Sequence, residues 1–338
     1  LKVFSGYWSD RLGKRKALVV SGYAISSVAK AFFPFVKSWI HLVALRPIER
    51  VGKGLRTAPR DALIADSSAY GRMGRSFGIH RALDTSGAIL GSVLAFIFVW
   101  FFGFEFRMIL LIAALLGFMA LVPLIFVREV RAGVRAERSP SLSVGLRELE
   151  KPFKVFVAIT TIFALGNFSY MFFILKAWRV FQLILPEKMA NSIPILLYII
   201  FNISYALLSI PIGNLSDKVG KKRILSIGYL IFSLTCLGFT ISSSIPTFIL
   251  FFLLYGLFQA SVDAVQRAYA SDLASERWRG TALGTFHTSI GLATLPASAI
   301  AGFLWDINPN LTFIYGAVMA FIASILLMTL ADLTKPNR

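Results

Sequence analysis

Long apolar stretches separated by short polar loops run through almost the whole chain. Each is long enough to cross the roughly 30 Å hydrocarbon core of a bilayer as a helix. The ten stretches lie near residues 17–36, 39–66, 75–102, 107–127, 153–183, 192–215, 224–242, 246–273, 280–305 and 312–333. Lipid offers the backbone no hydrogen-bond partners, so helices are expected, and the alternating pattern of a membrane barrel is absent. The pattern predicts an all-α integral membrane protein.

Composition agrees with this prediction. Of the 338 residues, 57% are hydrophobic and 15% are charged, and the formal net charge is +18. In a soluble protein this charge would suggest nucleic acid, but here the basic residues lie in short clusters between apolar stretches. We therefore expect membrane lipids, and no nucleic acid, among the partners. The single cysteine, Cys236, lies inside an apolar stretch and rules out an intramolecular disulfide.

Lysine and arginine are concentrated in every second loop. The basic loops are residues 11–16, 72–75, 128–154, 218–223 and 277–279, whereas the opposite loops hold little more than Lys37, Arg107 and Lys188. Because basic loops stay on the cytoplasmic side, this alternation places those loops and the C-terminus in the cytoplasm. The compact loops and the absence of an organellar presequence favour a prokaryotic inner (cell) membrane.

A polar, arginine-rich stretch at 128–152 separates four apolar stretches from six. It predicts a cytoplasmic linker between an N-terminal half at 1–127 and a C-terminal half at 153–338. If the halves are equal, helix 1 and most of helix 2 come before Leu1, and residues 1–8 are the end of helix 2.

Two short motifs occur once in each half at nearly the same spacing. The pattern Gly-x-x-Ser-Asp-x-x-Gly-Lys stands at residues 6–14 and 213–221, and Gly-x-x-x-Gly stands at 74–78 and 280–284. Because both motifs recur at nearly the same distance along the chain, the second half is interpreted as a duplicate of the first.

The longer motif resembles motif A of the major facilitator superfamily (MFS), which lies between helices 2 and 3 and again between helices 8 and 9. The resemblance covers essentially the whole chain. It implies two pseudo-symmetric six-helix bundles, a solute site between them, alternating access and a monomer. It also implies gating roles for Asp10, Lys14, Asp66, Asp217 and Lys221. Asp61 is an alternative to Asp66 as a gating partner, and simple topological and packing roles remain the alternative for both loops.

The stretch at 39–66 carries five basic and two acidic side chains between residues 46 and 61. Charges are costly in lipid, so these side chains must face protein or water. The basic residues recur every three or four positions and therefore share one helix face. This surplus predicts a cavity in which Arg50, Lys53 and Arg56 attract an anionic group.

Four titratable residues on other stretches are candidates for a change of protonation during transport: Asp84, Asp263, His80 and His287. Counting from the helix ends places Asp84 at the depth of Arg56, and the repeat places Asp263 roughly at the position of Arg56. These residues and the three basic ones form the predicted substrate-binding or coupling set. A static salt-bridge network that holds helices together is the alternative.

No nucleotide-binding loop, metal-ligand cluster or activated nucleophile is readable, so neither cofactor nor metal is expected, and an ion gradient is the expected energy source. The hypothesis is a secondary transporter, proton-coupled, for a small anionic or zwitterionic solute, and not an enzyme. A multidrug-type efflux antiporter is the alternative, but it would need acids to dominate the cavity. A membrane-embedded enzyme or a non-transporting sensor is a further alternative, and an enzyme would show a polar catalytic cluster at a loop.

Overall fold

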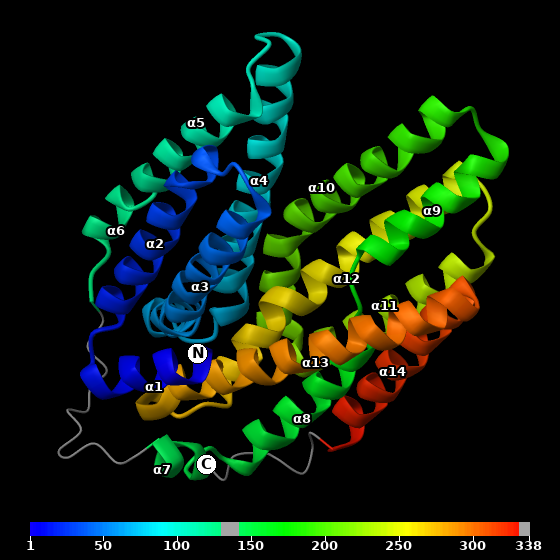
Figure 1. The fold of residues 1–338 in the computed structure, drawn as a ribbon. Coiled ribbons are helices and arrows are strands. Elements are labelled where there is room, and N and C mark those ends of the chain that lie inside the picture. The colour runs from blue at the N-terminus through cyan, green and yellow to red at the C-terminus, as the bar shows by residue number, and fades with distance from the viewer. Residues whose placement is uncertain (130–141, 331–338) are drawn as a thin grey trace. The chain divides into compact units, whose positions relative to one another are not determined.

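The computed structural model describes residues 1–129 and 142–330, and within these ranges it contains helices and no strands (Figure 1). The all-α prediction is confirmed. The chain divides into two compact units, the first from residues 1–68, 90–150 and 274–288 and the second from 69–89, 151–273 and 289–338.

The first unit is built around a pair of closely packed helices. Glycines make the close packing of α2 (Arg15–Ala31) and α3 (Trp39–Ser67) possible, because a Cβ atom on Gly22 would lie 2.7 Å from the carbonyl oxygen of Gly52. The elements that lie wholly within this unit are α1 (Lys2–Leu12), α2 (Arg15–Ala31), the 3₁₀ turn η1 (Phe33–Phe35), α3 (Trp39–Ser67), α5 (Phe106–Met119), α6 (Val122–Phe126), α7 (Leu142–Arg147) and the 3₁₀ turn η2 (Glu276–Trp278).

The second unit has an aromatic core. Phe163 stacks on Tyr229 with ring centroids 4.0 Å apart, and Phe232 packs edge-on against Phe163. Such rings bury large apolar areas, which explains part of the high phenylalanine content. The helices wholly within this unit are α8 (Lys151–Gly166), α9 (Met171–Ile184), α10 (Glu187–Val219), α11 (Lys221–Ile241), α12 (Ile245–Asp272) and α14 (Pro309–Leu330).

Two helices contribute to both units. Helix α4 (Met73–Trp100) begins in the second unit and its residues 90–100 belong to the first, whereas α13 (Arg279–Ile307) begins in the first unit and continues in the second from residue 289. Both helices begin at a Gly-x-x-x-Gly motif. The two helices that carry the repeated motif are therefore also the two helices that are divided between the units.

In both copies the loop motif ends a helix at a glycine with a positive φ angle. Helix α1 ends at Gly13 with φ of 59°, and α10 ends at Gly220 with φ of 108°. Residues with a side chain rarely adopt these values, so glycine allows the chain to leave one helix and enter the next within two residues. The motif therefore specifies a very short helix-to-helix connection.

Nine stretches of the described residues are helical, long enough and apolar enough to cross a membrane. The remaining predicted stretch, 39–66, is the 29-residue helix α3, whose charges set it apart from those nine. The stretch at 153–183 is helical on both sides of an interruption at residues 167–170. The division into halves at 128–152 stays a prediction, and residues 130–141 of that linker, like the C-terminal residues 331–338, lie outside the described residues.

Candidate functional site

Asp10, in the last turn of α1, caps the first turn of α13. Its Oδ1 accepts a hydrogen bond from the backbone N–H of Gly280 at 2.9 Å. Its Oδ2 accepts from the N–H and the hydroxyl of Thr281 at 2.7 and 2.8 Å. The first N–H groups of an α-helix have no partner in their own helix, and the helix dipole favours an anion there. The motif carboxylate therefore occupies the anion site at the start of α13.

Glycines allow α1 and α13 to meet at this point. A Cβ atom on Gly6 would lie 2.0 Å from the carbonyl oxygen of Gly280, and one on Gly284 would lie 2.4 Å from that of Lys2. Both distances are too short for any real contact, so a side chain at either position would force the helices apart. The glycines that recur in both motifs are thus contact positions as well as turn positions.

Buried basic residues complete this site, which we call the first latch and define as Asp10, Arg15, Asp66 and Arg279. Arg15 has 2% of its side chain exposed and lies 3.3 Å from Asp10, and it also forms an ion pair with Asp66. Asp66 pairs with Arg279 as well. Two acids and two bases make the first latch neutral overall, and a buried ionic cluster needs such balance.

The gating residues predicted in the first half lie at different places. Asp10 and Asp66 are both in the first latch, whereas Lys14 is exposed and its neighbour Arg15 holds the buried position. Asp61, the alternative to Asp66, lies outside the first latch and contacts Arg60 and His287 instead. The gating role itself stays a prediction.

The second loop motif forms a matching site at the start of α4, which we call the second latch and define as Asp217, Lys221 and Asp272. Asp217 accepts hydrogen bonds from the backbone N–H groups of Gly74 and Arg75, both at 2.8 Å. Lys221 Nζ lies 3.0 Å from Asp217 and 2.8 Å from Asp272. Both predicted residues of this copy, Asp217 and Lys221, therefore lie together.

The charged face of α3 contains two internal pairs and a basic stretch between them. Of the two acids between residues 46 and 61, Glu49 lies 3.3 Å from Arg46, and Asp61 lies 2.9 Å from Arg60. The basic residues between the two pairs are Arg50, Lys53 and Arg56, the same three that the sequence singles out. Arg50 and Lys53 are exposed on α3.

Arg56 is the most enclosed of the three. Its Nη1 donates a hydrogen bond to the hydroxyl of Ser26 at 2.9 Å, and its guanidinium group lies 4.1 Å from the centre of the Tyr23 ring. Both partners are on α2, and an arginine held over an aromatic ring has a defined orientation. This arrangement holds a planar, permanently charged donor group against α2.

His287 and Asp61 join α13 to α3. The Nε2 atom of His287 lies 2.8 Å from Asp61 Oδ2, while Asp61 Oδ1 accepts two hydrogen bonds from Arg60, at 3.0 and 2.9 Å. Asp61 has 0% of its side chain exposed. The carboxylate thus has a permanently charged partner on one oxygen and a titratable one on the other.

Asp263 on α12 is surrounded by donors from three helices. The hydroxyl of Tyr205 on α10 donates to Oδ2 at 2.6 Å, and Arg267 donates to Oδ1 at 2.9 Å. Arg81 on α4 lies 2.5 Å from Oδ2 and also 2.7 Å from Asp84. Arg81 therefore links the two acids that the sequence selected.

The other residues of the predicted set lie near this cluster along the chain. His80 is the half-buried neighbour of Arg81 on α4, and the side chain of Asp84 is 57% exposed. The predicted meeting of Arg56 with Asp84, and the opposition of Arg56 and Asp263, stay predictions.

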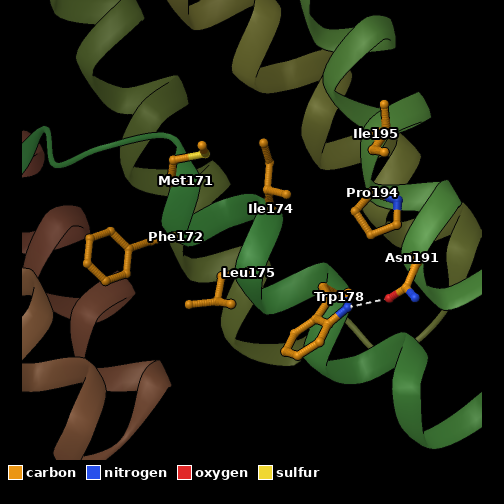
Figure 2. Close-up of a pocket in the computed structure, with 8 residues that line it drawn as sticks. All are labelled: Met171, Phe172, Ile174, Leu175, Trp178, Asn191, Pro194 and Ile195. Carbon is orange, nitrogen blue, oxygen red and sulfur yellow. Dashed lines mark hydrogen bonds between the residues drawn. The ribbon is translucent and has the colours of Figure 1, made fainter. Parts of the chain in front are cut away.

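An apolar pocket of about 370 Å³ lies between α9 and α10. Figure 2 shows Trp178 and Asn191 at one edge, where the indole N–H donates to the amide oxygen at 2.9 Å. The lining contains no charged side chain and consists of Met171, Phe172, Ile174, Leu175, Trp178, Asn191, Pro194 and Ile195. Its chemistry does not suit an anion, so it lies outside the candidate set.

Comparison with known proteins decides the class. The family model described as the Major Facilitator Superfamily matches residues 1–200 and 177–338. The chain belongs to the major facilitator superfamily. An uncharacterised MFS-type transporter of Methanocaldococcus jannaschii is 49% identical over 328 residues, which are 97% of this chain and 81% of that protein. The resemblance found in the sequence is confirmed.

Two more distant similarities differ in extent. Multidrug resistance protein 1 of Bacillus subtilis is 28% identical over 138 residues, covering 41% of this chain and 35% of that protein. The proton:xylose symporter XylE has the same fold, with a TM-score of 0.75 and 16% identity, covering 98% of this chain and 82% of that structure. The protein is therefore a multi-pass membrane transporter with the MFS fold, of a family that carries small-molecule solutes, and not an enzyme.

Sequence reasoning did not select Arg15, Arg81 or Asp61 as site residues, although all three lie beside residues that it did select. Arg15 follows Lys14 in the same basic run, and Arg81 follows His80. Asp61 was considered only as a gating partner. The sequence does show a charged residue directly beside each selected one. Which of the two neighbours forms the ion pair depends on the direction of its side chain, and only the structure shows that direction.

Proposed function

We propose that this MFS protein is a proton-coupled secondary transporter of a small anionic or zwitterionic solute. The observation that supports this most strongly is the basic face of α3. Arg50, Lys53 and Arg56 stand between two internal ion pairs, so the stretch from 46 to 61 has more positive than negative charge. A solute with a carboxylate or phosphate group would complement this surplus, and arginine binds such planar or tetrahedral groups through paired hydrogen bonds.

Alternating access would use the two latches. To release α13, Asp10 must give up its hydrogen bonds to Gly280 and Thr281, and to release α4, Asp217 must give up those to Gly74 and Arg75. The first latch is a cluster of buried charges, and the second joins the half-buried Asp217 and Lys221 to the exposed Asp272. In each latch the ion pairs and the capping hydrogen bonds would be lost together when the helix is released. Such all-or-none contacts suit a transporter that changes between two states.

The position in the membrane is proposed from the loops. The basic loops, which include the start of α13 and the two motif connections, would face the cytoplasm of a prokaryotic cell whose inner membrane holds the protein. Both latches would then be cytoplasmic gates. We propose a monomer, as the resemblance to the family implies.

Proteoliposomes with an imposed pH gradient test the proposal. A panel of labelled carboxylates, phosphates and amino acids should contain at least one solute whose flux depends on the gradient. Replacing Arg56→Gln should lower that flux by roughly tenfold or more, because a hydrogen bond to a charged group contributes about 1.5–3 kcal/mol. The matched control is Arg46→Gln on the same helix, since Arg46 is 60% exposed and paired with Glu49. Equal loss in both variants, or no gradient-dependent flux, would contradict the proposal.

A multidrug-type efflux antiporter is the second candidate, favoured by the partial similarity to the Bacillus multidrug protein. Cation export would depend on acids such as Asp84 and Asp263. Ethidium efflux from proteoliposomes distinguishes the two: efflux that Asp263→Asn abolishes and Arg56→Gln leaves intact supports the antiporter.

A further inference from the structure

The two halves differ at one equivalent position of their latch helices. Aligned on Gly74 and Gly280, Arg81 of α4 and His287 of α13 stand the same number of residues into their helices. Each contacts an acid on a neighbouring helix: Arg81 contacts Asp263 on α12, and His287 contacts Asp61 on α3. The same helix-to-helix contact is thus made by a permanently charged base in one unit and by a titratable one in the other.

This contact lies just beyond the first latch along α13. Gly280 is capped by Asp10, Gly284 lies against the backbone of Lys2, and His287 follows one helical turn later. The N-terminal part of α13 is therefore held at three successive levels, first by α1 and then by α3. Only the last of these contacts includes a histidine.

We infer that His287 and Asp61 form the proton-binding contact of the transport cycle, with His287 holding the proton while α13 lies against α3 and releasing it when the helices separate. The inference rests on the proposed proton coupling and names its site. Asp61 becomes a functional residue that the candidate set did not contain, because it supplies the negative charge that the imidazolium needs.

The physical basis is the strength of a charge-assisted hydrogen bond. A neutral imidazole can donate a hydrogen bond to the carboxylate, and an imidazolium adds the attraction between opposite charges, so the contact is stronger when His287 carries the proton. Proton binding therefore strengthens the attachment of α13 to α3. In the second unit Arg81 cannot lose its proton, so the corresponding contact does not respond to pH in this way.

The helices that carry the pair, and the helices of this unit packed against them, hold other charged and titratable groups. Among them are Lys2 and Asp10 on α1, Arg15 and Tyr23 on α2, Arg56, Arg60 and Asp66 on α3, and Arg279 on α13. The acids among these are buried within the ion pairs of the first latch. Arginine stays charged over the whole physiological range, so His287 is the member whose unperturbed titration falls between pH 5 and 8.

Hydrogen–deuterium exchange of α13 residues 279–288 tests the inference in the intact protein in nanodiscs. Exchange rates, corrected for the intrinsic effect of pH, should fall by about tenfold between pH 8 and pH 5.5 as the contact gains its charge. His287→Gln keeps a hydrogen-bonding group without the titration, so its corrected rates should not change with pH. His287→Arg copies the other half and should show slow exchange at every pH.

Two controls separate this inference from the wider proposal. Arg81→Gln, in the second unit, should leave the pH dependence of residues 279–288 unchanged, and Asp61→Asn should abolish it. If wild-type exchange does not depend on pH, or His287→Gln retains the dependence, the inference is wrong even where proton-driven solute flux is measured. If the pH dependence is present and His287→Gln removes it, the proton site stands even where the flux assay fails, and the failure then concerns the proposed solute.

Discussion

Asp10→Asn should release the start of α13. The side chain accepts three hydrogen bonds from Gly280 and Thr281 at 2.7–2.9 Å and lies 3.3 Å from Arg15. Asparagine keeps the shape but loses the charge and one acceptor oxygen, so two helix N–H groups compete for one partner. Losing charged hydrogen bonds in a buried site costs about 2–3 kcal/mol, which shifts the equilibrium of this contact roughly 30- to 150-fold towards release.

Amide exchange at Gly280 and Thr281 measures that shift directly, because these N–H groups lie in the first turn of the helix, where no acceptor in the same helix protects them. Their exchange should quicken by the same factor in Asp10→Asn. The matched variant is Asp217→Asn, which should quicken exchange at the start of α4 and leave Gly280 and Thr281 unchanged, since Asp217 caps a different helix. Unchanged protection at Gly280 and Thr281 in Asp10→Asn would refute the capping role.

Steric and polar contacts give further predictions. Gly6→Ala should lower the free energy of unfolding by about 1–3 kcal/mol, because the new Cβ would lie 2.0 Å from the Gly280 oxygen. A thermal melting curve should show a lower melting temperature. Gly87→Ala is the control: no atom lies within 4 Å of its new Cβ, so the melting temperature should hold or rise. Tyr205→Phe removes the 2.6 Å hydrogen bond to Asp263 and should cost about 1–2 kcal/mol by the same measurement. Unchanged melting in Gly6→Ala or Tyr205→Phe would contradict the corresponding contact.

The sequence predicted the positions of the latches because glycine, aspartate and their spacing recur in both halves. It did not show which basic residue turns inward. Helix α2 begins at Arg15 with Lys14 as the residue before it, whereas α11 begins at Lys221. The motif lysine is exposed in the first copy, whereas in the second it lies between Asp217 and Asp272 with 11% of its side chain exposed. A one-residue difference in where a helix begins is too small for pattern reasoning to resolve.

The contact between His287 and Asp61 shows a different limit. The charged face of α3 was predictable from its spacing, since one helix determines which side chains share a side. Which of those charges meets a residue far along the chain depends on how α13 crosses α3, and the pattern along the chain contains no such information. The alternation of basic and non-basic loops, by contrast, depends only on the order of residues along the chain, so the sequence alone shows it.

Proton movement that accompanies solute transport tests the central claim most directly. Protein is reconstituted into vesicles that contain a pH-sensitive dye, and solutes of the anionic and zwitterionic panel are added outside one at a time. The account predicts that a transported solute changes the internal pH, that Arg56→Gln reduces this change, and that His287→Gln removes it. Solute flux with no accompanying change of internal pH would contradict proton coupling, and a response only to organic cations would contradict the proposed solute class.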